Sequence, residues 1–417
     1  MADEPPLEAR QPIGGRLSGF SDVPRRVKWL IYLISFSAFG YGYLLILVTA
    51  YLPNLGVDPS NVGLILGAVG ISFVVSAIPL GMFSDRRGRK PVLFFGLLLL
   101  PPSLAVFAFT TDVMSLVLAG IVAGVAEGAY LTNWNAIIAD QTTPKNRDAA
   151  FSLSFIVGTS AMGVGMAAPF VFPAIQSVAG LDTHTVHVAA LLTFCALGLV
   201  SPIALLPVLR GYKDVKRMER RSADWSKLKP LLKFSGINSL IGLGAGIIIP
   251  LIATWLLLKF SVPDTYSGPL LAIASLTIGL AAFASTALSR RFGQVRAIVM
   301  TQSLSMIFML SLAFMPTAIL AGAVYLVRAA LMNMSSPLAD SFLMGIVAKE
   351  DRGLASGINT LFWRLPNSAT TVVGGIILDM GKTQSIYYDV PIFIAAGFYA
   401  VSITLFYLVF KDVKPSG

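Results

Sequence analysis

Cysteine, histidine and charged residues are all scarce in this sequence. Of its 417 residues one is cysteine and two are histidine, and charged residues make up 12%. A single cysteine, Cys195, excludes a disulfide framework and a cysteine-ligated metal site. The two histidines, His184 and His187, are too few to hold a metal ion without other ligands. We therefore expect no metal and no cofactor.

The low charge content also excludes an ordinary soluble domain. Soluble domains carry about 25% charged residues, whereas this chain is 55% hydrophobic. Its apolar residues form segments that are each long enough for the ~20 residues with which a helix crosses a bilayer. They are residues 28–52, 61–83, 91–110, 114–138, 149–174, 187–209, 231–258, 267–288, 296–315, 317–346, 354–378 and 388–410. We predict an all-α integral membrane protein with twelve transmembrane helices.

The basic residues indicate how the chain is oriented in the membrane. The net charge of +10 does not indicate a nucleic-acid partner, because lysine and arginine are confined to short connectors between apolar segments. The chain ends and every second connector hold 27 of the 31 basic residues, and the opposite connectors hold two. This bias predicts that both termini are cytoplasmic. The first apolar run is too long for a cleaved signal, so we expect a multi-pass protein of the plasma membrane.

Three landmarks of the first half recur in the second half, which indicates an internal repeat. The pairs, each 205 positions apart, are Gly63 and Gly268, Gly88 and Gly293, and Arg147 and Arg352. We therefore predict two pseudo-symmetric six-helix bundles with parallel topology. The expected parts are a cytoplasmic tail at 1–27, bundles at 28–209 and 231–410, a basic inter-bundle loop at 210–230 and a second tail at 411–417.

A strongly basic run separates the second and third apolar segments. Its notable residues are Gly81, Asp85, Arg86, Gly88, Arg89 and Lys90, which read G-x-x-x-D-R-x-G-R-K. This pattern resembles the loop 2–3 signature of the major facilitator superfamily of transporters. Four cations and a carboxylate in so short a run require a water-facing loop. The glycines are expected to let backbone and neighbouring helices approach closely.

The resemblance implies a role for these charges. In the superfamily the equivalent groups latch the inner gate when the central cavity opens outward, so we expect a gating role for Asp85, Arg86 and Arg89. In the second half the carboxylate position of the pattern is Arg290, so only the first half is expected to carry the full set of charges.

Four ionisable residues fall inside or near the ends of the predicted spans. They are Glu127, Arg328, Asp340 and Arg364. A charge at mid-bilayer costs at least ~2.5–3.5 kcal/mol, so such groups normally face water or a partner. In the resembled fold Glu127 and Arg328 lie on opposite walls of the central cavity. Either they form a buried pair that ties the two halves together, or Glu127 takes up and releases a proton as Arg328 approaches and withdraws.

Further candidates surround these charges. Helical spacing places Tyr130 and Trp134 on the face of Glu127, where they would offer an aromatic surface to an organic solute. Tyr41 of the first segment adds a polar group, and Asn333 shares a face with Asp340 near the inner gate.

The eleventh segment carries a polar line at helical spacing: Gly357, Thr360, Arg364, Ser368 and Thr371. Arg364 either faces the cavity or snorkels to the cytoplasm. His184 and His187 are interpreted as solvated loop residues, with a pH sensor as the alternative.

These features predict a secondary active transporter that moves a small organic solute by alternating access, with protons coupled through Glu127 and export favoured. The chain is most similar to the drug:proton antiporter branch, although Gly124 stands where that branch has an arginine. One alternative is proton-coupled uptake or facilitated transport of an organic anion held by Arg328 and Arg364. Another is a non-transporting receptor or scaffold. We expect that the chain is not an enzyme, because the sequence contains no nucleotide-binding loop, nucleophile–base pair or metal cluster. The expected partners are the solute, protons and membrane lipid, with the chain acting as a monomer.

Overall fold

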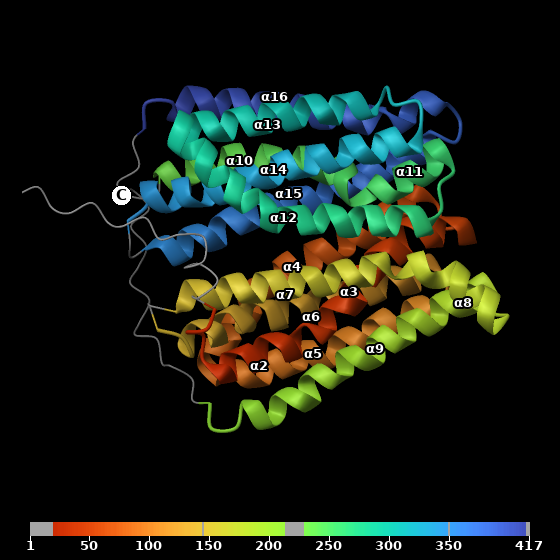
Figure 1. The fold of residues 1–417 in the computed structure, drawn as a ribbon, viewed down its shortest axis with the longest axis horizontal. Helices are drawn as coiled ribbons and strands as arrows, with labels where there is room; N and C mark the ends of the chain where they lie inside the picture. The colour runs from red at the N-terminus through yellow and green to blue at the C-terminus, as the bar shows by residue number, and fades with distance from the viewer. Residues whose placement is uncertain (1–19, 144–145, 213–228, 349–350, 414–417) are drawn as a thin grey trace, which may run out of the picture.

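The computed structural model describes residues 20–143, 146–212, 229–348 and 351–413, and within them it is helical without β-strands. Residues 1–19 of the predicted tail, most of the predicted inter-bundle loop and residues 414–417 lie outside this description. Two groups of helices lie one above the other in Figure 1, with the first half of the chain below and the second half above.

The first bundle contains helices α2 to α9 and their short 3₁₀ and π segments. In chain order they are α2 (Arg25–Ile34), α3 (Phe36–Ile46), η1 (Leu47–Tyr51), η2 (Leu52–Leu55), α4 (Pro59–Arg87), α5 (Arg89–Ala105), η3 (Val106–Ala108), α6 (Val113–Asp140), α7 (Arg147–Ala167), η4 (Ala168–Val171), α8 (Phe172–Ala179) and α9 (Thr183–Val208).

The second bundle contains α10 to α16. Its elements are α10 (Lys229–Ile248), η5 (Ile249–Leu251), α11 (Ile252–Phe260), α12 (Asp264–Phe292), α13 (Gln294–Leu312), α14 (Ala318–Ile346), α15 (Arg352–Met380), η7 (Ser385–Tyr388) and α16 (Val390–Phe410).

The helices account for the twelve predicted membrane crossings. Within the described residues, ten helical spans are long and apolar enough to cross a bilayer. The other two crossings are α12 and α15, which are each 29 residues long. The fifth and seventh crossings each join two α-helices through a 3₁₀ turn, and the first crossing ends in the π segment η1 and the 3₁₀ segment η2. The chain thus forms the predicted pair of six-helix bundles.

The molecule has two ends that face opposite sides. The end at which α2 begins and α16 finishes is called the termini end. Helix α4 also ends there at Arg87, and α6 ends there at Asp140. The opposite one, which we call the far end, holds the end of η2 at Leu55 and the start of α12 at Asp264.

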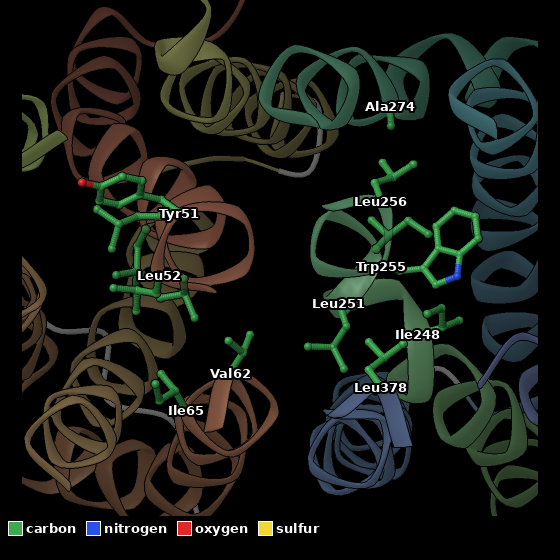
Figure 2. Packing of buried hydrophobic residues seen from close by; sticks show 14 of the residues in the cluster. Tyr51, Leu52, Val62, Ile65, Ile248, Leu251, Trp255, Leu256, Ala274 and Leu378 are labelled. Carbon is green, nitrogen blue, oxygen red and sulfur yellow. The ribbon is translucent and has the colours of Figure 1, made fainter. Parts of the chain in front are cut away.

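Close packing between the bundles is found in the half of the molecule next to the far end. A Cβ on Gly63 of α4 would lie 2.7 Å from the Thr371 carbonyl oxygen of α15, so the two backbones touch there. The Thr254 hydroxyl of α11 donates a 2.6 Å hydrogen bond to the carbonyl oxygen of Thr49 in η1. One hydrophobic cluster continues through both bundles at this level, and Figure 2 shows Val62 of α4 opposite Leu251 of η5.

Gly88 forms the turn between the second and third crossings. It is the single residue between α4 and α5 and has φ 101°, a left-handed conformation that favours glycine. Gly293 joins α12 to α13 in the same way with φ 79°. The two glycines thus make equivalent turns in the two halves. A Cβ on Gly81 would be 3.4 Å from the nearest side-chain atom, which is ordinary contact, so no close helix approach requires that glycine.

Candidate functional site

An ion pair joins the two bundles midway along the helices. Arg364 of α15 places Nη1 3.3 Å from Oε1 of Glu127 on α6. The Glu127 side chain is 7% exposed and the Arg364 side chain is 32% exposed. Each bundle therefore contributes one of two opposite charges, and the arginine is the member that solvent reaches.

Aromatic side chains surround this pair. The Arg364 guanidinium lies 4.0 Å from the centre of the Phe73 ring of α4, which is a close cation–π contact. Tyr41 of α3 and Tyr130 of α6 are near enough to interact electrostatically with both charges. Glu127 Oε2 is buried without a hydrogen-bond partner in the described residues. Of these groups, Phe73 was not predicted, because an apolar residue in an apolar helix carries no distinguishing signal.

The exposure of the residues along the polar line of α15 shows from which end solvent reaches the Glu127–Arg364 pair. Gly357 and Thr360, toward the termini end, are exposed. Arg364 is partly exposed, whereas Ser368, toward the far end, is buried against α4, and Thr371 is buried with its hydroxyl hydrogen-bonded to α10. This face of α15 is thus exposed on the termini side of Arg364 and packed on α4 on the far side. The side chain of Arg364 turns to Glu127, so the alternative in which it snorkels away is wrong.

Arg328 does not meet Glu127, contrary to the sequence-based expectation. It is 4% exposed, and its Nη2 donates a 2.7 Å hydrogen bond to the Tyr399 hydroxyl of α16. Its guanidinium carbon is 5.9 Å from the centre of the same ring. Arg328 therefore turns toward the interior of the second bundle, and the expected Glu127–Arg328 pair is replaced by Glu127–Arg364.

Three other candidates lie apart from the pair. Trp134 is buried in the core of the first bundle, where its Nε1 donates a 3.0 Å hydrogen bond to Ser154 of α7. This packing corrects the expectation that Trp134 offers a surface to a solute. Asn333 is partly buried and Asp340 is exposed, both on the termini half of α14.

The charges of the 81–90 run divide into two groups. Arg89 is 4% exposed and forms an ion pair with Asp140 at the end of α6. The Tyr212 hydroxyl donates a 2.6 Å hydrogen bond to the same carboxylate, and burial is the main reason why the pKa of Tyr212 is raised. Asp85 and Arg86 are exposed. Arg89 thus binds within its own bundle, and Asp85 has no ion-pair partner in the described part of the chain.

The histidines are helical rather than loop residues. Asp182 is the N-cap of α9, and hydrogen bonds from Thr185 hold the pKa of its carboxyl below the ordinary value. This aspartate–threonine pattern is the signal that could have placed the helix start before His187. His187 is 2% exposed, which corrects its interpretation as a solvated residue, and Nε2 lies 3.3 Å from Asp264 of the second bundle.

Comparison with known proteins agrees with this architecture. A family model described as Major Facilitator Superfamily matches residues 29–238 and 234–417. The nucleoside transporter NupG superposes with a TM-score of 0.72 at 17% identity, over 93% of this chain and 100% of that structure. A bacterial homologue of the human lysosomal transporter Spinster, in an inward-facing and occupied conformation, gives 0.72 at 15% identity, over 92% and 96%. At these identities the likeness concerns the fold.

Curated relatives match shorter stretches. Multidrug resistance protein 2 of Bacillus subtilis (strain 168) is 29% identical over 144 residues, which are 32% of this chain and 36% of that protein. Inner membrane transport protein YajR of Escherichia coli (strain K12) is 30% identical over 184 residues, 43% of this chain and 38% of that protein. The matched stretches thus span about a third of these relatives.

Proposed function

The chain is a member of the major facilitator superfamily and hence a multi-pass membrane transporter for a small-molecule solute, and we propose that it exports an organic solute in exchange for protons. The exchange would proceed by alternating access, with the two bundles opening in turn at the termini end and at the far end. The observation that carries the proposal is the Glu127–Arg364 pair, which joins the bundles where the open part of the structure ends.

The pair can couple a proton to the movement of the bundles. A carboxylate that accepts a proton loses its charge and most of its attraction to the guanidinium. Glu127 would therefore release Arg364 when it is protonated and hold it when it is ionised. Because the two residues belong to different bundles, the protonation state of Glu127 would bias how the bundles are arranged.

Several features favour an organic solute moving outward. Phe73, Tyr41 and Tyr130 give the site an aromatic surface, and the paired charges give it no net charge. One relative, multidrug resistance protein 2 of Bacillus subtilis, is named for resistance to multiple drugs, which export would explain. We place the termini end in the cytoplasm, because 27 of 31 basic residues were assigned to that side. The described conformation is then open inward, with the exposed charges of Asp85 and Arg86 available to latch the other state.

Uptake of an organic anion is the second candidate. It is favoured by the partial exposure of Arg364, which would become an unpaired cation whenever Glu127 is protonated. Arg328 is a weaker candidate for binding an anion, because it is buried and hydrogen-bonded to Tyr399.

Reconstitution into vesicles that contain a pH-sensitive dye tests the proposal. A panel of organic cations, neutral aromatic compounds and organic anions is added on each side in turn, and proton flux is recorded. We expect a cationic or neutral aromatic compound to evoke proton counterflow that is lost in Glu127→Gln. Asp112→Asn is the matched control, because Asp112 is an exposed N-cap and asparagine caps equally well. Proton co-flow with anions alone would support the second candidate, and no flux with any compound would support a receptor or scaffold.

A further inference from the structure

A second pair of titratable groups, a histidine and an aspartate, joins the bundles at the far end. His187 lies in the second turn of α9, and Asp264 is the first residue of α12. The distance from His187 Nε2 to Asp264 Oδ2 is 3.3 Å, and both side chains are buried. Burying an imidazole and a carboxylate costs free energy that apolar residues would not cost, so the pair calls for a reason beyond packing.

The other ring nitrogen of His187 has a partner suited to both protonation states. The Tyr43 hydroxyl of α3 lies 2.8 Å from His187 Nδ1 and 3.2 Å from the His187 carbonyl oxygen. When the imidazole is neutral with its proton on Nε2, the hydroxyl can donate to Nδ1. When the imidazole is protonated, Nδ1–H donates to the hydroxyl, which in turn donates to the carbonyl oxygen. Neither state leaves a ring nitrogen without a partner.

Asp264 is arranged to receive a cation. Its Oδ2 is buried and has no hydrogen-bond partner in the described residues apart from the 3.3 Å approach to Nε2. As the first residue of α12 it lies at the positive end of the helix dipole, which offsets part of the cost of burying the ionised carboxylate. A proton on His187 would therefore turn a weak polar contact between the bundles into a buried ion pair.

Water can reach this region from the far end. A cavity of about 240 Å³ is lined by Tyr51, His184 and His187, together with residues of the η2 and η3 turns. The Tyr51 ring is stacked on the His187 ring with 3.5 Å between centres, and the Tyr51 hydroxyl lies 3.3 Å from His184 Nδ1. The cavity thus offers a path for a proton to the rim of the pair.

We propose that His187 and Asp264 form a proton-binding site, separate from Glu127, that holds the two bundles together at the far end. A proton taken up from the far side binds His187 and stabilises the conformation in which that end is closed. The titratable groups that face His187 are Tyr43 of α3, Tyr51 of η1, His184 on its own helix and Asp264 of α12, with Asp182 at the start of α9. Asp264 is the carboxylate in contact with the ring, so protonation strengthens the contact between bundles.

The proposal deepens the alternating-access function, and a measurement that needs no solute tests it. Spin labels are placed at Leu55 and Ile386, which are exposed and belong to different bundles at the far end. Pulsed dipolar spectroscopy then reports the share of molecules with the far end closed. Cys195 is replaced by serine to avoid a third label. We expect acidification from pH 8 to pH 5 to increase the closed share, and we expect His187→Gln and Asp264→Asn to abolish that increase.

Two comparisons make the outcome specific. His184→Gln removes a histidine of the same helix that is not part of the contact between bundles, and it should retain the response. Glu127→Gln should change the closed share at each pH by a constant amount and still retain the increase on acidification, which separates this site from the coupling site of the proposed function. The proposal is overturned if the parent chain shows no response, if His187→Gln and Asp264→Asn both retain it, or if Glu127→Gln alone abolishes it.

A further variant, Tyr43→Phe, keeps the proposal testable if His187→Gln does not fold. If His187→Gln does not fold, Asp264→Asn and Tyr43→Phe carry the test. Tyr43→Phe should move the midpoint of the response to lower pH, because the imidazolium Nδ1–H has lost its acceptor. An unchanged midpoint would contradict the role given to the Tyr43 hydroxyl. Absence of solute flux in vesicles would bear on the proposed function alone, because this response needs no solute.

Discussion

Arg364 of α15 and Glu127 of α6 are charged partners from different bundles, with 3.3 Å between Nη1 and Oε1. On the far-end side of this pair α4 and α15 are packed together, and on the termini side the same face of α15 is exposed. The pair therefore lies where a movement of one bundle against the other changes contacts most directly. The free energy of this ion pair depends both on proton binding to Glu127 and on the arrangement of the two bundles.

The first prediction concerns the energetic coupling within the pair. Arg364→Ala leaves the Glu127 carboxylate buried without its partner, so we expect it to destabilise the chain more than Glu127→Gln does. The double variant should be more stable than the sum of the single effects implies. We expect a coupling energy of about 1–2 kcal/mol, within the range for residues in contact and reduced because Arg364 is partly exposed. Equilibrium unfolding of the four proteins in mixed micelles measures it. Additive effects would mean that the two residues do not interact.

The second prediction separates Arg328 from the coupling site. Tyr399→Phe removes the hydroxyl that accepts from Arg328, whose Nε already has no hydrogen-bond partner in the described residues. We expect a loss of about 1–3 kcal/mol in stability, the cost of an unsatisfied buried group. Solute-evoked proton flux per folded molecule should be unchanged. Tyr407→Phe on the same helix is the control, because Tyr407 is 40% exposed and should change stability by less than ~0.5 kcal/mol. Reduced flux at normal stability would return Arg328 to the transport site.

The contrast between the two arginines shows what sequence can and cannot predict in a membrane helix. Spacing from the helix ends gives the depth of a charge, and both Arg328 and Arg364 were placed inside the membrane. The direction of a side chain requires a polar face, and α14 is apolar around most of its circumference near Arg328. In α15 the polar line through Thr360 and Ser368 shows the face on which Arg364 lies, but it left open whether Arg364 faces the cavity or snorkels and did not identify Glu127 as its partner.

The second limit on prediction from sequence was contacts between segments that are far apart in the chain. Arg89 was chosen from its motif, but its partner Asp140 and the neighbouring Tyr212 lie more than 50 and 120 positions away in sequence. His187 was assigned to a loop because the predicted apolar segment begins only at that residue, whereas the Asp182 cap starts the helix earlier. The twelve crossings and the repeat were predictable because length and a constant offset depend on no tertiary contact.

The third prediction distinguishes the two groups of charges in the 81–90 run. Arg89→Ala should destabilise the chain by roughly 3–5 kcal/mol, because it leaves Asp140 without its buried partner. Asp85→Asn should cost less than ~0.5 kcal/mol, because Asp85 is exposed. It should still reduce transport if Asp85 latches the state closed at the termini end. Unfolding and vesicle flux measured on both variants check this, and normal flux with Asp85→Asn would exclude the latch.

The fourth prediction concerns closure of the far end. The Ser60 hydroxyl of α4 donates a 2.8 Å hydrogen bond to Asp379 of α15, so the two side chains meet across the bundles. Ser60→Cys with Asp379→Cys should be linked by a short bifunctional thiosulfonate. Linkage should stop transport, and reduction should restore it, because the far end must open in each cycle. Each single cysteine variant treated alike is the control, and the native Cys195 is buried. Continued transport by fully linked protein would rule out opening at this end.

The fifth prediction uses glycine to test how tightly the far end closes. A Cβ on Gly63 would lie 2.7 Å from the Thr371 carbonyl oxygen and 2.9 Å from the Gly375 Cα, so Gly63→Ala must push the bundles apart there. Gly357→Ala is the matched control, because a Cβ at Gly357 meets nothing within 4 Å. Overpacking of about 1–3 kcal/mol should lower the population of the closed far end by about tenfold. The rate of cross-linking between cysteines at 60 and 379 should fall to a similar extent in Gly63→Ala and stay unchanged in Gly357→Ala. Equal rates in the two variants would mean that the contact between α4 and α15 does not limit closure.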